Sequence, residues 1–343
     1  MIDTWPSKDL EPVFRCPLCN GAKRSLLYPN LTDRVFRTAL GAWNLYRCED
    51  CGSGYLDPRP TASSIGRAYA MYYTHEPSER PIIHRKGVLQ SILHDAINGY
   101  RNARYKTNHQ PAIRIGRWLI PLFPPLHAWV DAKYRHLKPP TAGARLLDVG
   151  CGHGGFIKLA KEIGWEAEGI DFDPKAVQAA RARGLNVRCG TVKELAERAD
   201  QYDVITLSHV IEHVHEPLDL LLDLYRLLKP SGQLWLETPN LNSLGAAMFG
   251  RNWRGLEPPR HLVLFNPKSL RKGLEYAGFR QVKQRWRGLM LIEVFELSAA
   301  IRDGRDVRAT LLQIKPRLQH IPAEVYEMLV PSRREFLTMI ATK

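Results

Sequence analysis

The sequence contains no long hydrophobic run. Nothing in it reaches the roughly 18 to 20 uninterrupted apolar residues that span a bilayer. The closest stretch, residues 112–130, contains Arg114, Arg117 and three prolines, which excludes a regular membrane-spanning helix. Two interpretations of this stretch remain open: a connection that covers the protein core, or a peripheral segment that lies on a membrane surface.

The first residues also lack a basic start followed by an apolar stretch, so we predict neither a signal peptide nor a transit peptide and expect a cytoplasmic protein. Hydrophobic residues make up 44% and charged residues 24% of the 343 positions, which excludes a disordered or collagen-like chain. This length allows about two domains.

Acidic residues are scarce relative to basic ones. The chain has 35 of the former and 49 of the latter, a formal charge of +14. Such a charge favours anionic partners, namely phosphorylated or nucleotide-linked small molecules, nucleic acid or a membrane surface. Half of the excess lies in residues 74–140, with 11 lysines and arginines against 4 acids. We interpret residues 61–140 as a basic, largely helical connecting segment, whose charge either binds a ligand or covers a solvated surface.

Cysteine is also rare, but four of the six cysteines form two C-x-x-C pairs, Cys16 with Cys19 and Cys48 with Cys51. Two such turns present four thiolates, the ligand set of a tetrahedral structural Zn²⁺ site. Gly21 and the glycine after Cys51 suit positive φ angles in these turns. Together with two short predicted strands, over residues 26–36 and 43–47, the pattern resembles a zinc ribbon within residues 1–60. Disulfides or a redox motif are the alternative.

From Arg145 onwards, β-type apolar runs alternate with helical patterns. The runs are RLLDVG, WEAEGID, NVRCG, YDVITLSHV and GQLWLETP. Such alternation predicts an α/β fold with a parallel sheet and with ligands bound at the carboxyl ends of its strands. We place this domain at residues 141–298 and interpret residues 299–343 as a helical extension.

The first of these strands runs into a glycine-rich turn, with glycines at 150, 152 and 154, that precedes a helical pattern. Glycines let the backbone approach a ligand closely, and the following helix offers free N–H groups. Asp171, at the end of the next strand, can accept both hydroxyls of a ribose. The G-x-G-x-G spacing differs from the dinucleotide fingerprint. Asp148 would repel a pyrophosphate but could support the ammonium of an amino-acid ligand, directly or through water, which favours S-adenosylmethionine over NAD.

With these motifs, residues 145–297 resemble a class I S-adenosylmethionine-dependent methyltransferase. LLDVGCGHG resembles the first motif of that family and GIDFDP its ribose-binding turn. The stretch that begins SHVIEHVHEP resembles the subfamily of ubiquinone O-methyltransferases and bacterial sugar or natural-product methyltransferases. The resemblance implies a Rossmann-like seven-stranded sheet whose last strand is antiparallel. Residues 281–286 and 289–295 are our candidates for its final hairpin.

The resemblance also implies which residues contact the methyl donor. The glycines would line the methionine portion, the acid would hold the ribose, and the following aromatic residue would lie near the adenine. The complete predicted set is Asp148, Gly150, Cys151, Gly152, Gly154, Asp171, Phe172 and Ser208. Thr191 and Val192 stand where relatives often place an adenine-binding acid, which is a departure from the pattern.

Candidate catalytic residues follow the fourth strand of the domain. His209, Glu212 and His213 would lie at its carboxyl end, which faces the methyl donor in this family. A histidine suits the role of general base for a hydroxyl acceptor, and we favour His213; the alternative is a histidine that is bonded to backbone at a helix start. Ubiquinone O-methyltransferases carry E-x-x-E-H here, which resembles a divalent-metal site. With a histidine at position 209, the ligand set is softer than Mg²⁺ prefers.

Residues 240–266 follow the fifth strand and, in related enzymes, such a segment caps the acceptor pocket. Trp253 could stack on a sugar or an aromatic acceptor, while Arg260 and His261 could bind a phosphate, or His261 could act as the base. The alternative is a loop whose aromatic side chains simply pack on the sheet.

The leading interpretation is methyl transfer to a hydroxyl or carbon of a small molecule, namely a sugar, a nucleotide-sugar or an intermediate of a glycan or natural product. The alternative enzyme is a ribosomal or transfer RNA methyltransferase that grips RNA through its zinc ribbon and basic segment. A third interpretation is a zinc-ribbon binding protein with a vestigial methyltransferase domain.

Overall fold

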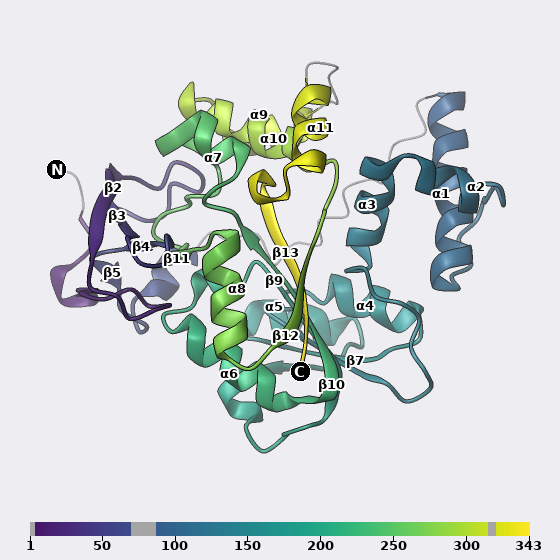
Figure 1. Cartoon of the computed structure of the whole chain (residues 1–343), viewed down its shortest axis with the longest axis horizontal. Coiled ribbons are helices and arrows are strands. Elements are labelled where there is room, and N and C mark those ends of the chain that lie inside the picture. Colours follow the sequence, from purple (N-terminus) through teal and green to yellow (C-terminus); the bar gives the residue numbers. More distant parts are fainter. Residues whose placement is uncertain (1–3, 70–86, 315–319) are drawn as a thin grey trace.

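The computed structural model describes residues 4–69, 87–314 and 320–343. Its centre is a seven-stranded sheet in the order β12-β13-β10-β9-β6-β7-β8 (Figure 1). Strand β13 is antiparallel to both of its neighbours, and the pairs from β10 to β8 are parallel. The predicted α/β fold is therefore confirmed. The strands are β6 (Arg145–Val149), β7 (Glu166–Asp171), β8 (Val187–Cys189), β9 (Tyr202–Ser208), β10 (Leu228–Pro239), β12 (Arg280–Arg285) and β13 (Phe336–Thr342).

Alternate residues of the central strands enter two separate cores. Leu146 and Val204 pack with helices on one face of the sheet, whereas Leu147 and Ile205 pack on the other. This period of two is what a pleated strand imposes when both of its faces are covered. The covering helices are α4 (Gly155–Glu162) and α5 (Pro174–Ala182) on the first face, with α6 (Pro217–Leu227) and α8 (Pro267–Tyr276) on the second.

The last strand of the sheet comes from an unexpected place. We predicted a strand at residues 289–295, but helix α9 (Leu291–Arg302) begins there, so that prediction was wrong: a short apolar run does not distinguish a strand from a buried helix. The predicted helical tail does contain helices, but its last residues form β13, which we did not predict. The predicted strand at 281–286 is confirmed as β12. Helices α7 (Leu244–Phe249), α9, α10 (Val307–Gln313) and α11 (Ile321–Leu329) gather at one end of the molecule (Figure 1).

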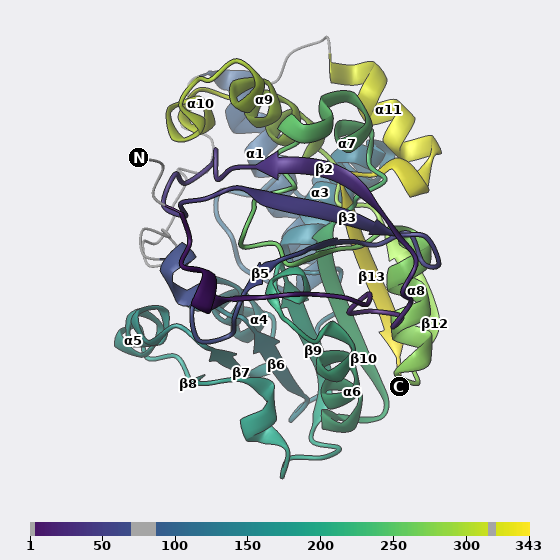
Figure 2. The ribbon, with the colours of Figure 1, turned by 90° about the vertical axis from the view of Figure 1, so that its left-hand side faces the viewer.

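The N-terminal residues form a small antiparallel sheet that includes a strand from the main domain. Its order is β11-β4-β3-β2, and β11 (Val263–Leu264) pairs with β4 (Gly54–Leu56). The other strands are β2 (Arg24–Leu31) and β3 (Trp43–Cys48), while β1 (Leu10–Glu11) pairs separately with β5 (Arg59–Pro60). Because one core cluster contains residues of both parts, this cysteine module packs as an integral part of the protein (Figure 2).

The remaining helices form an arm beside the sheet. The helical arm comprises α1 (Val88–Tyr105), α2 (Gly116–Leu119), the 3₁₀ turn η4 (Ile120–Leu122) and α3 (Pro124–Lys133) (Figure 1). Short 3₁₀ turns complete the structure, at η1 (Ser7–Asp9), η2 (Ile65–Tyr69), η5 (Val192–Leu195), η6 (Ile211–His213), η7 (Gly250–Asn252) and η9 (Pro331–Arg333).

Candidate active site and metal centre

The four cysteines of the module converge on one point. Their sulfur atoms all lie within 4.8 Å of one another, at 3.7 Å between Cys16 and Cys51 and 3.5 Å between Cys19 and Cys48. A tetrahedral cation with metal–sulfur bonds of about 2.3 Å places its sulfurs about 3.8 Å apart. The spacing therefore fits a four-thiolate metal site, and none of these cysteines forms a disulfide.

The two C-x-x-C turns have the same backbone geometry. In each, the first cysteine carbonyl accepts from the N–H four residues on, at Asn20 and at Gly52, both 2.9 Å away. Asn20 and Gly52 both have positive φ, whereas Gly21, which we expected to need it, does not. The buried Ser53 hydroxyl lies 2.9 Å from the sulfur of Cys51. This hydroxyl can donate to a thiolate, as the polar groups around a metal ligand commonly do.

The glycine-rich turn has the predicted form between β6 and α4. Gly150, Gly152 and Gly154 all have φ between +54° and +80°, and Gly154 immediately precedes α4. A Cβ at Gly150 would lie 2.3 Å from Val210, and one at Gly154 would lie 2.3 Å from Leu185. The turn therefore requires glycine both for its dihedral angles and for its close packing.

Asp171 stands at the end of β7 beside this turn. One carboxylate oxygen accepts the N–H of Gly152 at 2.7 Å, and the other accepts the N–H of Asp173 at 2.9 Å. Burial raises the pKa of Asp171, although these two hydrogen bonds oppose the shift. Phe172, the next residue, is 58% exposed. An acidic group and an exposed aromatic ring thus follow the glycine turn, in the order that we predicted.

Asp148 does not have the accessible position that we expected. Its carboxylate is fully buried, pairs with Arg135 at the end of the helical arm, and accepts the Thr206 hydroxyl at 2.9 Å. Burial raises the pKa of Asp148, and the guanidinium opposes that effect. Arg135 and Thr206 both contact Oδ1, whereas Oδ2 of Asp148 has no hydrogen-bond partner among the described residues. Support of a ligand ammonium by Asp148, directly or through water, stays a prediction.

Cys151 and Ser208, which we also predicted to contact the methyl donor, lie differently relative to the glycine turn. The thiol of Cys151 packs inward against the helix-covered face of the sheet, so only its backbone lines the turn. Ser208 ends β9 opposite Glu237 of β10. Tyr69, which the sequence did not single out, places its ring 5.7 Å from that of Phe172 and 6.0 Å from that of His213. Tyr69 therefore lies between Phe172, which follows Asp171, and His213.

A pocket of about 280 Å³ lies just beyond the carboxyl end of β9. Strand β9 pairs with β6, which leads into the glycine turn, and Val210, one residue after His209, contacts Gly150. Its walls come from the segment that follows β9, the end of β10, the loop of residues 253–261, the segment from Arg287 into α9, and the start of β13 with the residue before it. Its polar and charged lining residues are His209, His213, Trp253, Arg254, Glu257, His261, Arg287, Glu293 and Glu335.

Two histidines of the pocket contact main-chain carbonyl groups through Nδ1. His213 Nδ1 lies 3.0 Å from the carbonyl oxygen of Arg260 and 3.0 Å from the Tyr69 hydroxyl, and His261 Nδ1 lies 2.7 Å from the carbonyl oxygen of Gly255. Because a carbonyl oxygen only accepts, the bonds to Arg260 and Gly255 require a hydrogen on Nδ1 and leave the Nε2 lone pair of each neutral ring available, whereas a bond donated by Tyr69 would require the other tautomer of His213. Burial lowers the pKa of His261 to about 4, against the opposing charge of Glu257. His261 is therefore neutral at physiological pH.

Glu212 is fully buried and has partners for both oxygens. It accepts the Thr238 hydroxyl at 2.9 Å and pairs with His209 Nδ1 at 3.1 Å. Burial would raise the pKa of Glu212, but His209 and the neighbouring histidines outweigh it and lower the pKa to about 2. Glu212 is thus a permanent buried anion, which orients His209, and the structure does not expose it as an acid or base.

A potential second metal site differs from the predicted one. Glu212, His213 and His261 offer ligand atoms within 4.8 Å of one another, whereas His209 is not part of that group. His209 instead lies between Glu212 and Glu237. The third candidate ligand is therefore His261, which lies in the loop of residues 253–261, 48 positions after His213.

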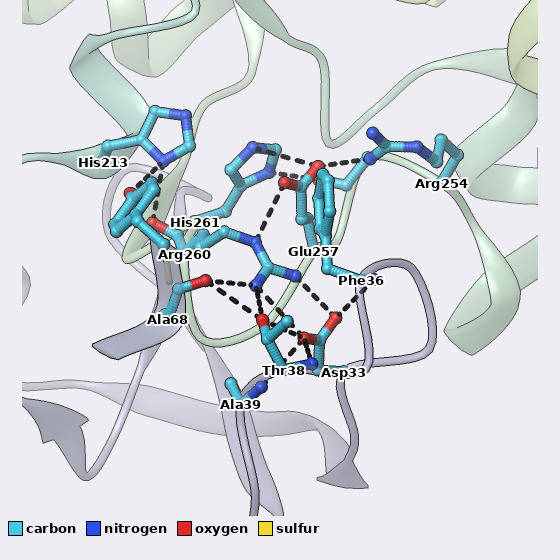
Figure 3. A network of polar contacts seen from close by, with 12 residues as sticks. Asp33, Phe36, Thr38, Ala39, Ala68, His213, Arg254, Glu257, Arg260 and His261 are labelled. Carbon is cyan, nitrogen blue, oxygen red and sulfur yellow. Dashed lines mark hydrogen bonds and ion pairs between the residues drawn. The ribbon is translucent and has the colours of Figure 1, made fainter. Parts of the chain in front are cut away.

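Arg260 does not face the pocket, which corrects its predicted role in phosphate binding. It is fully buried and pairs with Asp33 of the cysteine module at 2.5 Å and with Glu257 at 3.1 Å (Figure 3). It also donates to the Ala68 carbonyl at 2.9 Å. These contacts fix the main chain whose carbonyl orients His213, so the module and the pocket meet at Arg260.

Trp253 is also less accessible than its predicted stacking role requires. It is 3% exposed, and its indole N–H donates to Glu335 at 3.1 Å. Burial raises the pKa of Glu335 to about 7, although this donor and the N–H of Gly245 oppose the shift. Glu335 and Arg287 were not predicted, because nothing near them in the sequence marks a ligand site.

Comparisons with known proteins identify relatives of this chain. A family model described as a methyltransferase domain matches residues 125–284. A ubiquinone biosynthesis O-methyltransferase of Xanthomonas oryzae pv. oryzae (strain PXO99A) is 38% identical over 125 residues, which cover 34% of this chain and 52% of that protein. The chain thus spans about half the length of this relative. Another, from Bordetella avium (strain 197N), is 33% identical over 193 residues, covering 48% and 78%.

Among solved structures, an S-adenosylmethionine-dependent methyltransferase from Archaeoglobus fulgidus is 26% identical, with a TM-score of 0.43 over 62% of this chain and 93% of that one. The family assignment does not depend on this likeness. It follows from the Bordetella avium relative, most of whose length is covered, together with the strand order and the glycine turn. The chain belongs to the class I S-adenosylmethionine-dependent methyltransferases.

Proposed function

We propose that this chain transfers the methyl group of S-adenosylmethionine to a hydroxyl oxygen or a carbon of a small-molecule acceptor. The observation that carries the proposal is the pair of imidazole Nε2 lone pairs, on His213 and His261, in a pocket just beyond the carboxyl end of β9. The polar walls suit a hydroxyl-rich acceptor such as a sugar, a nucleotide-sugar or a glycan intermediate, because they combine hydrogen-bond donors with acceptors.

On the donor side, we assign the methionine portion to the glycines at 150, 152 and 154. We assign the ribose hydroxyls to Asp171 and the adenine to Phe172. When bound, S-adenosylmethionine supplies an electrophilic methyl group on a sulfonium. In this assignment, backbone N–H groups and one carboxylate hold the methyl donor. Their task is to align the methyl group with the acceptor, because an in-line displacement depends mainly on alignment.

On the acceptor side, we assign general base catalysis to His213, with His261 beside it. As the acceptor oxygen attacks the methyl carbon, the carbon–sulfur bond breaks and its electrons stay on sulfur. His213 Nε2 takes the hydroxyl proton. The carbonyl of Arg260 stabilises the resulting imidazolium, because it accepts from Nδ1.

We also propose that the cysteine module holds one structural Zn²⁺. Four thiolates fill a tetrahedral shell, which leaves no position for water or substrate, so this metal would organise the module. Whether Glu212, His213 and His261 hold a second cation is a separate question. Two imidazoles and one carboxylate suit a transition metal better than Mg²⁺, and we assign no catalytic step to such an ion.

The test is to incubate the protein with methyl-labelled S-adenosylmethionine and an extract of cells that lack it, and then to separate RNA, lipid, polysaccharide and small molecules. Label in small molecules or glycan supports the proposal. Label in RNA would support the alternative of an RNA methyltransferase, whose polyanionic substrate also suits the +14 charge. Failure to bind the donor at all would support the vestigial alternative.

Variants identify the base in the same assay. His213→Ala should lower turnover by roughly 10²-fold or more, with donor affinity nearly unchanged. His215→Ala is the matched control, because this histidine lies two residues away but bonds to the Pro60 carbonyl and does not line the pocket. A wild-type rate for His213→Ala together with a slow His261→Ala variant would transfer the role to His261.

A further inference from the structure

The helical arm has a packed inner side. Ala96, Ile97, Tyr100 and Val130 are buried in a small core that also contains Ile163 of the main domain. A Cβ at Gly116 would lie 1.9 Å from the backbone of Ala96, so α1 and α2 are in direct contact. The arm is therefore a rigid unit whose outer side is a defined surface.

That outer side is unusually apolar. Ile115, Trp118 and Leu122 follow an i, i+3, i+7 spacing, so they share one face of the continuous turn of α2 and η4. They are 52%, 57% and 71% exposed, and the adjacent Phe123 is 61% exposed. Single exposed apolar residues need no explanation, but a stripe of four large ones does.

The first turn of α1, in the same arm, also exposes apolar side chains, because Val88 and Leu89 are 77% and 82% exposed. We refer to Ile115, Trp118, Leu122 and Phe123 as the apolar face of the arm. In the described residues, no helix is long and apolar enough to cross a membrane.

The charges around the apolar face have one predominant sign. Residues 88–123 contain five lysines and arginines, of which Arg101 is buried, and a single acid, Asp95. Arg114 and Arg117 are exposed within the apolar stretch itself, and the Arg117 guanidinium lies 3.6 Å from the centroid of the Trp118 ring. A second copy of the chain would present the same cations, so two such faces would repel. A surface of anionic phospholipid headgroups attracts them.

We propose that the arm docks on the surface of a bilayer that contains anionic phospholipid, with the apolar face inserted at the boundary between headgroups and acyl chains. An interfacial aromatic ring, neighbouring leucine and phenylalanine side chains, and arginines at headgroup level are what peripheral binding requires. The inference is independent of the proposed function, because it depends on no residue of the active site.

The test is co-sedimentation of the full-length protein with vesicles of phosphatidylcholine alone or with about one-third phosphatidylglycerol. We expect binding to the anionic vesicles, and weaker binding as salt increases, because the Debye length falls from about 10 Å at 0.1 M to about 3 Å at 1 M. Trp118→Asp with Leu122→Asp should lower binding by roughly tenfold or more, since these changes remove apolar burial and add repulsive charge.

The matched control is Leu312→Asp with Tyr276→Asp. These side chains are 89% and 73% exposed but lie outside the arm, on α10 and α8. Equal vesicle binding by the two double variants, or binding that does not depend on anionic lipid, would overturn the proposal. So would a salt-resistant dimer in analytical ultracentrifugation that only the arm variant dissociates, because a second copy would then cover this face. Thermal melting of each variant checks that it remains folded.

Discussion

The donor side and the acceptor side of the candidate site are built in different ways. On the donor side, the glycine turn and Asp171 lie within 22 consecutive residues of the chain, from Gly150 to Asp171, and main-chain N–H groups donate to the Asp171 carboxylate. The acceptor pocket combines segments that lie more than 120 residues apart, from His209 to Phe336. Buried charges, such as Glu212, Glu257 and Arg260, hold these segments together.

This difference determines which substitutions should disturb each half of the site. A backbone turn depends on glycine and on local strand geometry, so it tolerates changes elsewhere in the protein. A network of buried charges depends on every partner, because removal of one leaves another unpaired at low dielectric. Damage to the cysteine module should therefore reach the acceptor pocket through Asp33 and Arg260, and should not affect donor binding.

Metal loss is the largest perturbation that we expect. Cys48→Ser, or chelation of the metal, should lower stability by on the order of 5 kcal/mol or more, since the module sheet would lose its fixed turns. Thermal melting and zinc analysis measure the effect. Donor affinity by calorimetry should persist at temperatures at which the main domain remains folded. Cys189→Ser, at an exposed cysteine outside the cluster, is the control. An unchanged melting temperature in metal-free protein would refute the proposed metal site.

The ion pair between Asp33 and Arg260 ranks next. Asp33→Asn should cost about 3 to 5 kcal/mol in urea unfolding, because it leaves a fully buried guanidinium without this partner. Adding Arg260→Met should recover part of that loss, since the unpaired charge is then removed as well. Asp303→Asn, at an exposed pair with Arg302, should leave the unfolding midpoint unchanged. Additive effects of the first two substitutions would show that the pair is not coupled.

Glu335 gives the pocket a pH dependence. Its pKa rises from 4.5 to about 7 on folding, so the native state binds the extra proton between those values. The contribution to stability is complete below about pH 4.5 and is lost as the pH rises to about 7, a change of about 3 kcal/mol. Glu335→Gln should reduce this decline in urea unfolding measured between pH 4.5 and 8. The part that remains belongs to Glu327, whose pKa is raised to about 8 by burial. Glu275→Gln, on the exposed face of α8, should keep the whole decline. The same slope in both variants would contradict the prediction.

The donor side should show the smallest effect on free energy. Asp171→Ala should weaken S-adenosylmethionine binding by about 1 to 3 kcal/mol, as expected when hydrogen bonds to a charged group are lost. Asp173→Asn is the control, because it removes a nearby charge while it keeps the side-chain cap of α5. Calorimetry that finds Asp171→Ala unchanged would remove this residue from the ribose site. If Asp33→Asn weakens donor binding to the same extent, the two sides are not separable.

Sequence patterns predicted the parts of the fold that depend on neighbouring residues. The five strands from β6 to β10, the β12 strand and the glycine turn were all expected. The pairing of β13 with β10 was not, because its register joins Trp235 to Ile340, more than 100 residues apart. An apolar run such as that of β13 shows only that it is buried, and tertiary pairing decides that it is a strand.

The candidate site divides in the same way. The four cysteines, the glycines and His213 carry chemistry that a spacing of a few residues reveals, so the sequence by itself determined the cysteine cluster and the donor turn. Only the tertiary structure decided that Asp148 and Arg260 are buried ion-pair partners and that Asp33, Tyr69 and Glu335 contribute to the site. The physical reason is that a charged group takes its role from its surroundings. Burial and distant partners set its pKa and its access to ligand, and neither is encoded locally.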